Sequence, residues 1–159
     1  YFLMAAAAMF ATESDYGLAS DVGNYFYSSL RQLEWLREFL RTMLSGSPGV
    51  ALDPDYVAEQ WRWMLIRVPH PPLSREISGL TWLLFQDTLG PVTAYRVGVM
   101  VTYAGLAAGC AAFTASAARS LLAGIGAGLG ILLIPVLFAH GHFAHTDLFL
   151  SAFWFVSAA

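Results

Sequence analysis

Three of the four histidines of the chain lie within six positions near its C-terminal end, in the stretch AHGHFAH at residues 139–145. Imidazole nitrogens are common ligands of metals and of haem iron. On a regular helix His142 and His145 share one face because they are three residues apart, whereas His140 lies about 200° around the axis from His142. A single helix therefore cannot direct all three imidazoles at one centre.

These histidines have three alternative roles. Any one of His140, His142 and His145 is a candidate axial ligand to haem or chlorophyll. Alternatively, the three side chains lie in the headgroup layer at the end of an apolar segment. His142 and His145 also have the spacing of a two-histidine metal site, with Asp147 close by, but no complete ligand set is visible. We therefore predict a candidate haem or chlorophyll contact and no metal site.

The composition predicts an integral membrane protein. Apolar residues make up 57% of the 159-residue chain and charged residues only 12%, whereas soluble domains have about 25% charged residues. Residues 97–118 and 120–139 contain no charge. Each stretch reaches the length of about 20 helical residues that crosses the hydrocarbon core of a bilayer.

The two uncharged stretches predict an all-α membrane fold with a transmembrane helix hairpin at residues 92–147, because only Arg119 separates them. Pro135 is expected to bend the second helix ahead of the histidines. The apolar segments 1–12 and 148–159 are each shorter than a full span. We expect a partial span or a packed helix at either end, and a third span if the last segment crosses.

Alternating glycines occupy the middle of the second uncharged stretch. They form two small-xxx-small pairs, and such pairs let helices approach closely in lipid. A phosphate-binding loop is excluded because it needs a preceding strand and a water-exposed helix N-terminus. We therefore predict a helix-packing role for the four residues Gly124, Gly126, Gly128 and Gly130.

Residues 13–91 hold most of the charges and are expected to lie outside the membrane core or at its interface. Within them, 13–29 is expected to be a loop. Leucines at spacings of three and four predict an amphipathic helix at 29–44, and further helices are expected at 53–67 and 75–87. The polar face of the first helix mixes both signs of charge, which favours packing on protein over a lipid surface. The exposed apolar surface of this region indicates a protein interface.

Arg96 stands close to the beginning of the first expected span, in the stretch TAYRVGV. A cation at this depth either extends to the interface, next to Tyr95, or contacts a polar ligand. We therefore consider Arg96 a candidate contact to a quinone or to a lipid headgroup, beside its structural role as an anchor.

The stretch AYRVGVMVTYAG at residues 94–105, followed by a second span with histidines, resembles the cytochrome b membrane anchor of succinate dehydrogenase. In that family a His–Arg pair followed by a glycine opens the first span, and a haem-ligating histidine lies on the second. Tyr95 stands in the place of the histidine, and the histidine spacing of the second span differs. The resemblance implies a haem- or quinone-binding anchor subunit, which we keep as an alternative function.

No catalytic constellation is visible, because the chain shows no Ser/His/Asp arrangement, no set of cysteine ligands and no paired carboxylates within the spans. Its net charge of −3 gives no basic field for nucleic acid. We therefore expect a non-catalytic subunit of a larger energy-transducing membrane complex, respiratory or photosynthetic, and we favour the mitochondrial inner membrane over the thylakoid. The expected partners are lipid and other membrane subunits, contacted through transmembrane and amphipathic helices. A chlorophyll-binding photosystem subunit is a second alternative.

Overall fold

The computed structural model describes residues 1–17, 22–67 and 72–158, and within these ranges the protein is all-α, with no strand. The elements are α1 (Phe2–Ala11), the short 3-10 helix η1 (Glu13–Asp15), α2 (Val22–Leu44), α3 (Pro54–Arg67), α4 (Leu73–Leu89), α5 (Pro91–Ala117), α6 (Leu121–Leu133), α7 (Pro135–His140) and α8 (Thr146–Ala158).

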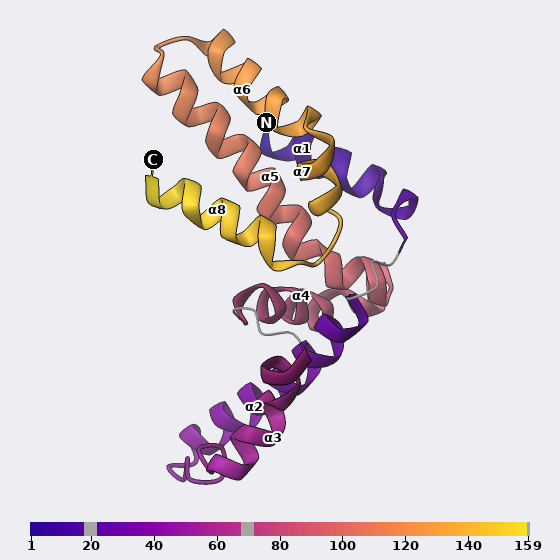
Figure 1. Ribbon diagram of the computed structural model, residues 1–159, viewed down its shortest axis with the longest axis vertical. Helices are drawn as coiled ribbons and strands as arrows, with labels where there is room; N and C mark the ends of the chain where they lie inside the picture. The colour runs from indigo at the N-terminus through magenta and orange to yellow at the C-terminus, as the bar shows by residue number, and fades with distance from the viewer. Residues whose placement is uncertain (18–21, 68–71, 159) are drawn as a thin grey trace.

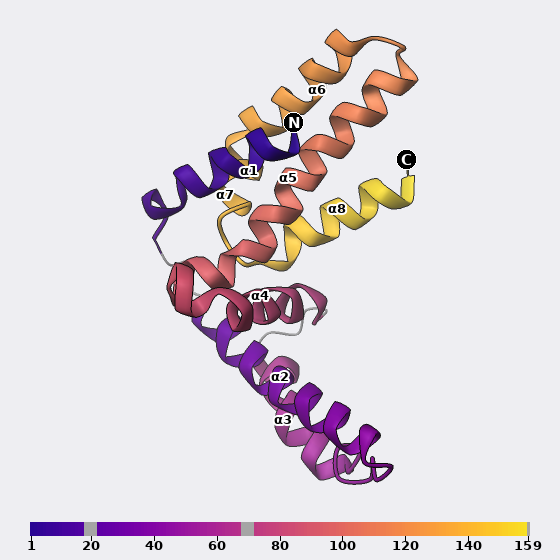
Figure 2. The ribbon, with the colours of Figure 1, turned by 180° about the vertical axis from the view of Figure 1, so that it is seen from behind.

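The helices form two groups (Figures 1 and 2). An apolar bundle contains α1, α5, α6, α7 and α8. The second group is an arm made of α2 and α3, at the opposite end of the molecule. α4 lies between the bundle and the arm, where it contacts α2, α5 and α8. The long helix α5 contacts α1, α4, α6 and α8. α1, α6 and α8 therefore all pack on this one helix, and Phe138 of α7 meets its Tyr103 ring edge-on.

α5 has clear local signals at both ends. Gly90 precedes it with a positive φ of 77°, and Pro91 occupies its first turn, where a missing N–H costs no hydrogen bond. Its 27 residues extend about 40 Å at 1.5 Å per residue. Among the described residues α5 is the one helix long and apolar enough to cross a membrane. Arg119 then turns the chain with a φ of 49°, and α6 returns alongside α5 (Figure 1).

The returning leg is two helices and not one continuous span, because Pro135 separates α6 from α7. Ile134 between them is extended, with φ −77° and ψ 108°. A proline has no N–H for the carbonyl four residues earlier, which here belongs to Ile131. The Tyr103 hydroxyl on α5 donates to that oxygen at 2.7 Å. The break is thus satisfied by the helix against which the leg packs.

The four glycines of α6 fall on two different faces. A Cβ on Gly124 would lie 2.6 Å from both the Ala111 carbonyl oxygen and the Ala115 Cβ of α5, and one on Gly128 would lie 2.7 Å from the Tyr1 ring. Gly126 and Gly130 have open space at the same position. The close approach of α6 to α5 therefore depends on the face that carries Gly124 and Gly128.

α2 begins seven residues before the amphipathic stretch that the leucine pattern indicates, so the expected loop at 13–29 is wrong from Val22 onward. Glycine and asparagine near the beginning of α2 favour a loop. Tertiary burial of the first turns outweighs that preference, because Tyr25 is buried and Ser29 is hydrogen-bonded to Tyr95 of α5.

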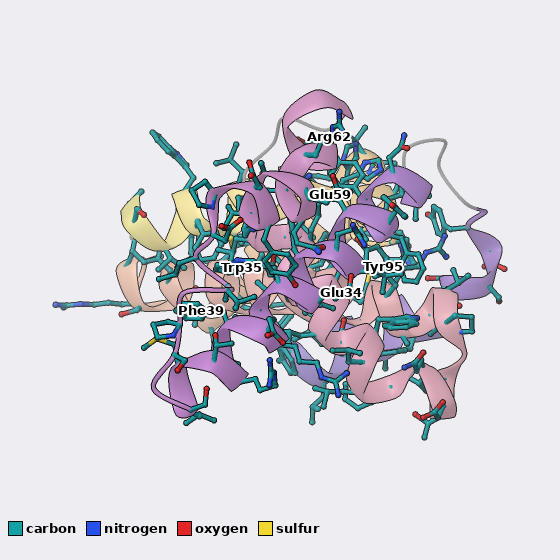
Figure 3. The ribbon with its side chains drawn as sticks, turned by 90° about the horizontal axis from the view of Figure 1, so that it is seen from below. Glu34, Trp35, Phe39, Glu59, Arg62 and Tyr95 are labelled. Carbon is teal, nitrogen blue, oxygen red and sulfur yellow. The ribbon has the colours of Figure 1, made fainter. Side chains whose placement is uncertain are left out.

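Aromatic stacking holds the arm together. The Trp35 ring stacks on Phe39 at 5.3 Å and meets the Trp61 ring edge-on at 5.4 Å, and Trp35 and Phe39 lie side by side in Figure 3. The indole N–H of Trp35 donates to the Ala51 carbonyl at 2.9 Å. At the beginning of α3, the Asp53 carboxylate accepts two backbone N–H groups at 3.0 Å, as an N-cap does.

The two glycine faces make a matched test of the helix contact. We expect Gly124→Ala to lower the free energy of unfolding by about 1–3 kcal/mol, because the added methyl overpacks the α5–α6 contact. Gly126→Ala fills open space and removes the helix cost of glycine, so it should raise stability by about 0.5–1 kcal/mol. Thermal unfolding of the two purified variants measures the difference. Equal midpoints would contradict the assigned faces.

Candidate functional site

Arg96 and His142, both singled out by sequence, converge on the short segment that follows α1. We call this segment, residues 12–17, the junction. It lies between the beginning of α5 and the turn after α7, and it ends at the last residue described before α2. Both side chains are fully buried, with exposed fractions of 1% and 0%.

The guanidinium of Arg96 holds the junction against α5. One terminal nitrogen donates to the Glu13 carboxylate at 2.9 Å and to the Tyr16 carbonyl at 3.0 Å, and the other donates to the Gly17 carbonyl at 2.6 Å. The second carboxylate oxygen of Glu13 accepts from the Thr93 hydroxyl at 3.0 Å. Both terminal nitrogens are thus engaged within the chain, and a contact to a quinone or lipid headgroup requires the junction to open.

The imidazole of His142 joins the junction to α7. Its Nδ1 lies 2.9 Å from the Phe138 carbonyl oxygen, and its Nε2 lies 3.1 Å from the Met9 carbonyl oxygen and 3.0 Å from the Thr12 hydroxyl. The ring stacks on Tyr16 at 4.2 Å with an interplanar angle of 12°. Both ring nitrogens are used inside the protein, so neither faces an axial ligand position for haem or chlorophyll.

His140 ends α7 and His145 lies on the turn that leads into α8, and the two side chains come together away from the junction. Their ring centroids are 6.3 Å apart, and the Nδ1 of His140 is 3.8 Å from an Asp147 carboxylate oxygen. The His145 ring contacts Tyr25 of α2 at 5.4 Å. In the described part of the chain, no three His, Cys, Asp or Glu side chains are grouped to hold a metal.

A small cavity lies beside His140 at the foot of α8. It measures about 180 Å³, and Val136, Asp147 and Ser151 are among its lining residues. Pockets that enclose a drug-sized ligand measure about 300–1,000 Å³. A haem or chlorophyll bound through His140 would therefore lie mostly outside this chain.

A buried polar cluster connects the arm to the bundle, and sequence reasoning missed it. Arg75 is fully buried, with its guanidinium 5.7 Å from the centre of the Tyr25 ring. The Tyr95 hydroxyl and the Ser29 hydroxyl are 2.8 Å apart. A signal was present in the sequence, because the uncharged polar residues Ser28, Ser29 and Gln32 of α2 share one helical face. The structure buries all three. Polar residues on an amphipathic helix are ordinarily assigned to solvent.

Burial also changes the pKa of Glu76, the acid next to Arg75. Desolvation raises the pKa of Glu76 from 4.5 to about 6, while the charge of Arg75 acts in the opposite direction. Glu76 lies in the first turn of α4, outside the apolar bundle. The protonated carboxyl is therefore favoured by folding.

Comparison of the chain with protein-family models, with curated proteins and with solved structures finds no match.

We expect Arg96→Met to lower the free energy of unfolding by about 3–5 kcal/mol, because it leaves the Glu13 carboxylate and two carbonyls without their donor. Adding Glu13→Gln should restore part of the loss. Arg62→Met is the matched control, since Arg62 forms an exposed pair with Glu59 at 3.8 Å, which contributes at most about 1 kcal/mol. Denaturant titration measures all three variants, and equal losses for the two arginines would exclude the junction contact as a major stabilising element.

The raised pKa of Glu76 predicts the sign of a pH effect. Because the folded protein binds this proton more tightly than the unfolded chain, stability falls as pH rises from 4.5 to about 6. Glu76→Gln should remove this part of the slope and make the protein more stable than wild type above pH 6. Asp87→Asn, an exposed acid on the same helix, is the control. If stability falls with pH in the Glu76→Gln variant as steeply as in the wild type, Glu76 is not the source of the pH dependence.

Proposed function

We propose that this chain is a non-catalytic membrane subunit of a larger energy-transducing complex, respiratory or photosynthetic. The observation that carries the proposal is the surface of the apolar bundle. Leu122, Leu133 and Trp154 there are 79%, 75% and 77% exposed, and they belong to a broad set of exposed apolar side chains. Apolar patches of this extent mark contact with lipid or with other proteins.

The dimensions of the bundle support placement in a bilayer. The 27 residues of α5 extend about 40 Å at 1.5 Å per residue, which exceeds the ~30 Å thickness of a hydrocarbon core. The charged residues nearest to the uncharged part of α5 are Arg96 at one end and Arg119 at the other. Charges at both margins and none between them fit a segment that crosses lipid.

The use of the reactive side chains supports a structural role. His142 and Arg96 are bonded to the junction, and their contacts hold α1, α5 and α7 together. The arm adds apolar side chains that the chain itself does not cover, among them Met43 and Leu44. Surfaces of this kind on a small subunit suit permanent assembly with other subunits.

A haem- or chlorophyll-binding subunit is the second candidate, and the accessible position of His140 is the observation in its favour. His140 is about one-third exposed and borders the cavity at the foot of α8. In this alternative the ring system would lie between His140 and a partner subunit.

The chain should migrate, in mild detergent extracts of its own membranes, within an assembly much larger than its 17.3 kDa. The absorption bands of that purified assembly then separate the two candidates. A structural subunit keeps the same Soret or chlorophyll bands in the His140→Ala and His145→Ala variants. Loss of a band in His140→Ala alone selects the second candidate, and migration of the chain at its own mass would exclude both.

A further inference from the structure

A long groove runs between α2 and α4, on the side of α2 that α3 leaves uncovered. It measures about 710 Å³, and its lining contains six leucines, Tyr27 and three charged residues. Leu33 is buried at 7% exposure, while Leu40, Leu80 and Leu83 are each about half exposed. These apolar side chains make a groove whose surface the chain itself leaves open.

α4 approaches α2 closely at one point of this groove. A Cβ on Gly79 would lie 2.8 Å from the Leu33 side chain, so the two helices are in direct contact there. A third helix that packs along this line would contact both of them. The lining extends along α2 from Tyr27 to Leu40, which is about 20 Å of helix. A partner segment of about four turns fits that length.

One edge of the groove carries alternating charges. Arg31, Glu34 and Arg37 are three residues apart on α2, and all three line the groove. Arg31 is already paired, at 3.2 Å with Glu34 and at 3.3 Å with Glu59 of α3. Arg37 is exposed and forms no ion pair with the part of the chain that the structure describes. One cation at this edge is therefore available to an acidic group from outside.

The charge pattern distinguishes between occupants. Helices that bind a lipid surface are usually rich in cations on their polar face, whereas this edge holds two arginines and a glutamate. Amphipathic helices bind in apolar grooves through side chains at i, i+3, i+4 and i+7, and charges at the rim set their register. The groove thus fits a protein helix better than an anionic bilayer.

We propose that the α2–α4 groove binds an amphipathic helix of a neighbouring subunit, with its leucine-type stripe in the groove and a carboxylate facing Arg37. This inference rests on the proposed function in one respect, because it takes the neighbour to be another member of the same complex. The binding chemistry itself follows from the groove and does not require the complex to be identified.

The direct test uses a defined probe and the full chain in detergent micelles. The probe is a fluorescent helical peptide of about four turns with a leucine stripe and glutamates along one edge, and its scrambled form is the control. We expect saturable binding of the probe alone. Leu83→Glu, in the groove, should abolish binding, whereas Leu84→Glu, more exposed but outside the lining, should leave it unchanged.

Charge reversal tests the predicted contact with Arg37. Arg37→Glu should weaken binding of the glutamate peptide several-fold and strengthen binding of a peptide with lysine in place of glutamate. Unchanged binding in both Arg37→Glu and Leu83→Glu would overturn the proposal. A shift from dimer to monomer in Leu83→Glu would also overturn it, because the groove would then bind a second copy of the chain. So would binding of the groove to phosphatidylcholine vesicles while the peptide does not bind.

The fraction of each variant that assembles in membranes distinguishes the groove proposal from the proposed function. If the chain enters a large assembly, Leu83→Glu should reduce the assembled fraction and Leu84→Glu should not. Equal assembly of both variants would overturn the groove proposal while the proposed function stands. Migration of the wild-type chain at its own mass would instead overturn the proposed function.

Discussion

Arg96 is the only charged residue of α5, and its burial constrains how the rest of the chain can pack. A buried guanidinium needs a carboxylate and several acceptors around it. The junction supplies them, since Glu13 and Tyr16 accept from one terminal nitrogen of Arg96 and Gly17 accepts from the other. Because the junction directly follows α1, the same contacts place α1 along α5. His142 then bonds the last turn of α1 and brings the beginning of the histidine turn to the same point.

The second constraint is that backbone carbonyls in apolar surroundings need hydrogen-bond donors. Where water is absent, each free carbonyl needs a donor from within the protein. Pro135 frees one carbonyl, and Tyr103 of α5 provides the donor. The break between α6 and α7 thus also depends on α5. It lets α7 turn toward the junction, where the Phe138 carbonyl meets His142.

The all-α class and most helix positions could be predicted from sequence, because hydrophobic periodicity and caps are local signals. The leucine pattern predicts the end of α2 at Leu44. The Asp53 cap of α3 and the glycine–proline pair before α5 each indicate where a helix begins. The beginning of α2 could not be predicted, since it depends on the contact between Ser29 and Tyr95, which are 66 residues apart.

Sequence reasoning selected Arg96 and the three histidines as candidate contacts, and it paired His142 with His145 on one helical face. The structure places His142 at the junction and His140 and His145 near α8 and α2. That separation depends on the path of the chain after Pro135, for which a single sequence gives no distance. Arg75 was not selected, since an arginine on an amphipathic helix gives no local signal that it will be buried.

We propose that α5 and the leg formed by α6 and α7 cross a bilayer, with the arm and the turn at Arg119 on opposite sides. Single cysteines at Thr88 and Ala118, in a Cys110→Ser background, test this in sealed vesicles with a membrane-impermeant maleimide. Both positions are exposed. We expect reagent outside the vesicle to label one of the two cysteines and the other to react only after the membrane is opened. Equal labelling of both from the outside would contradict the account.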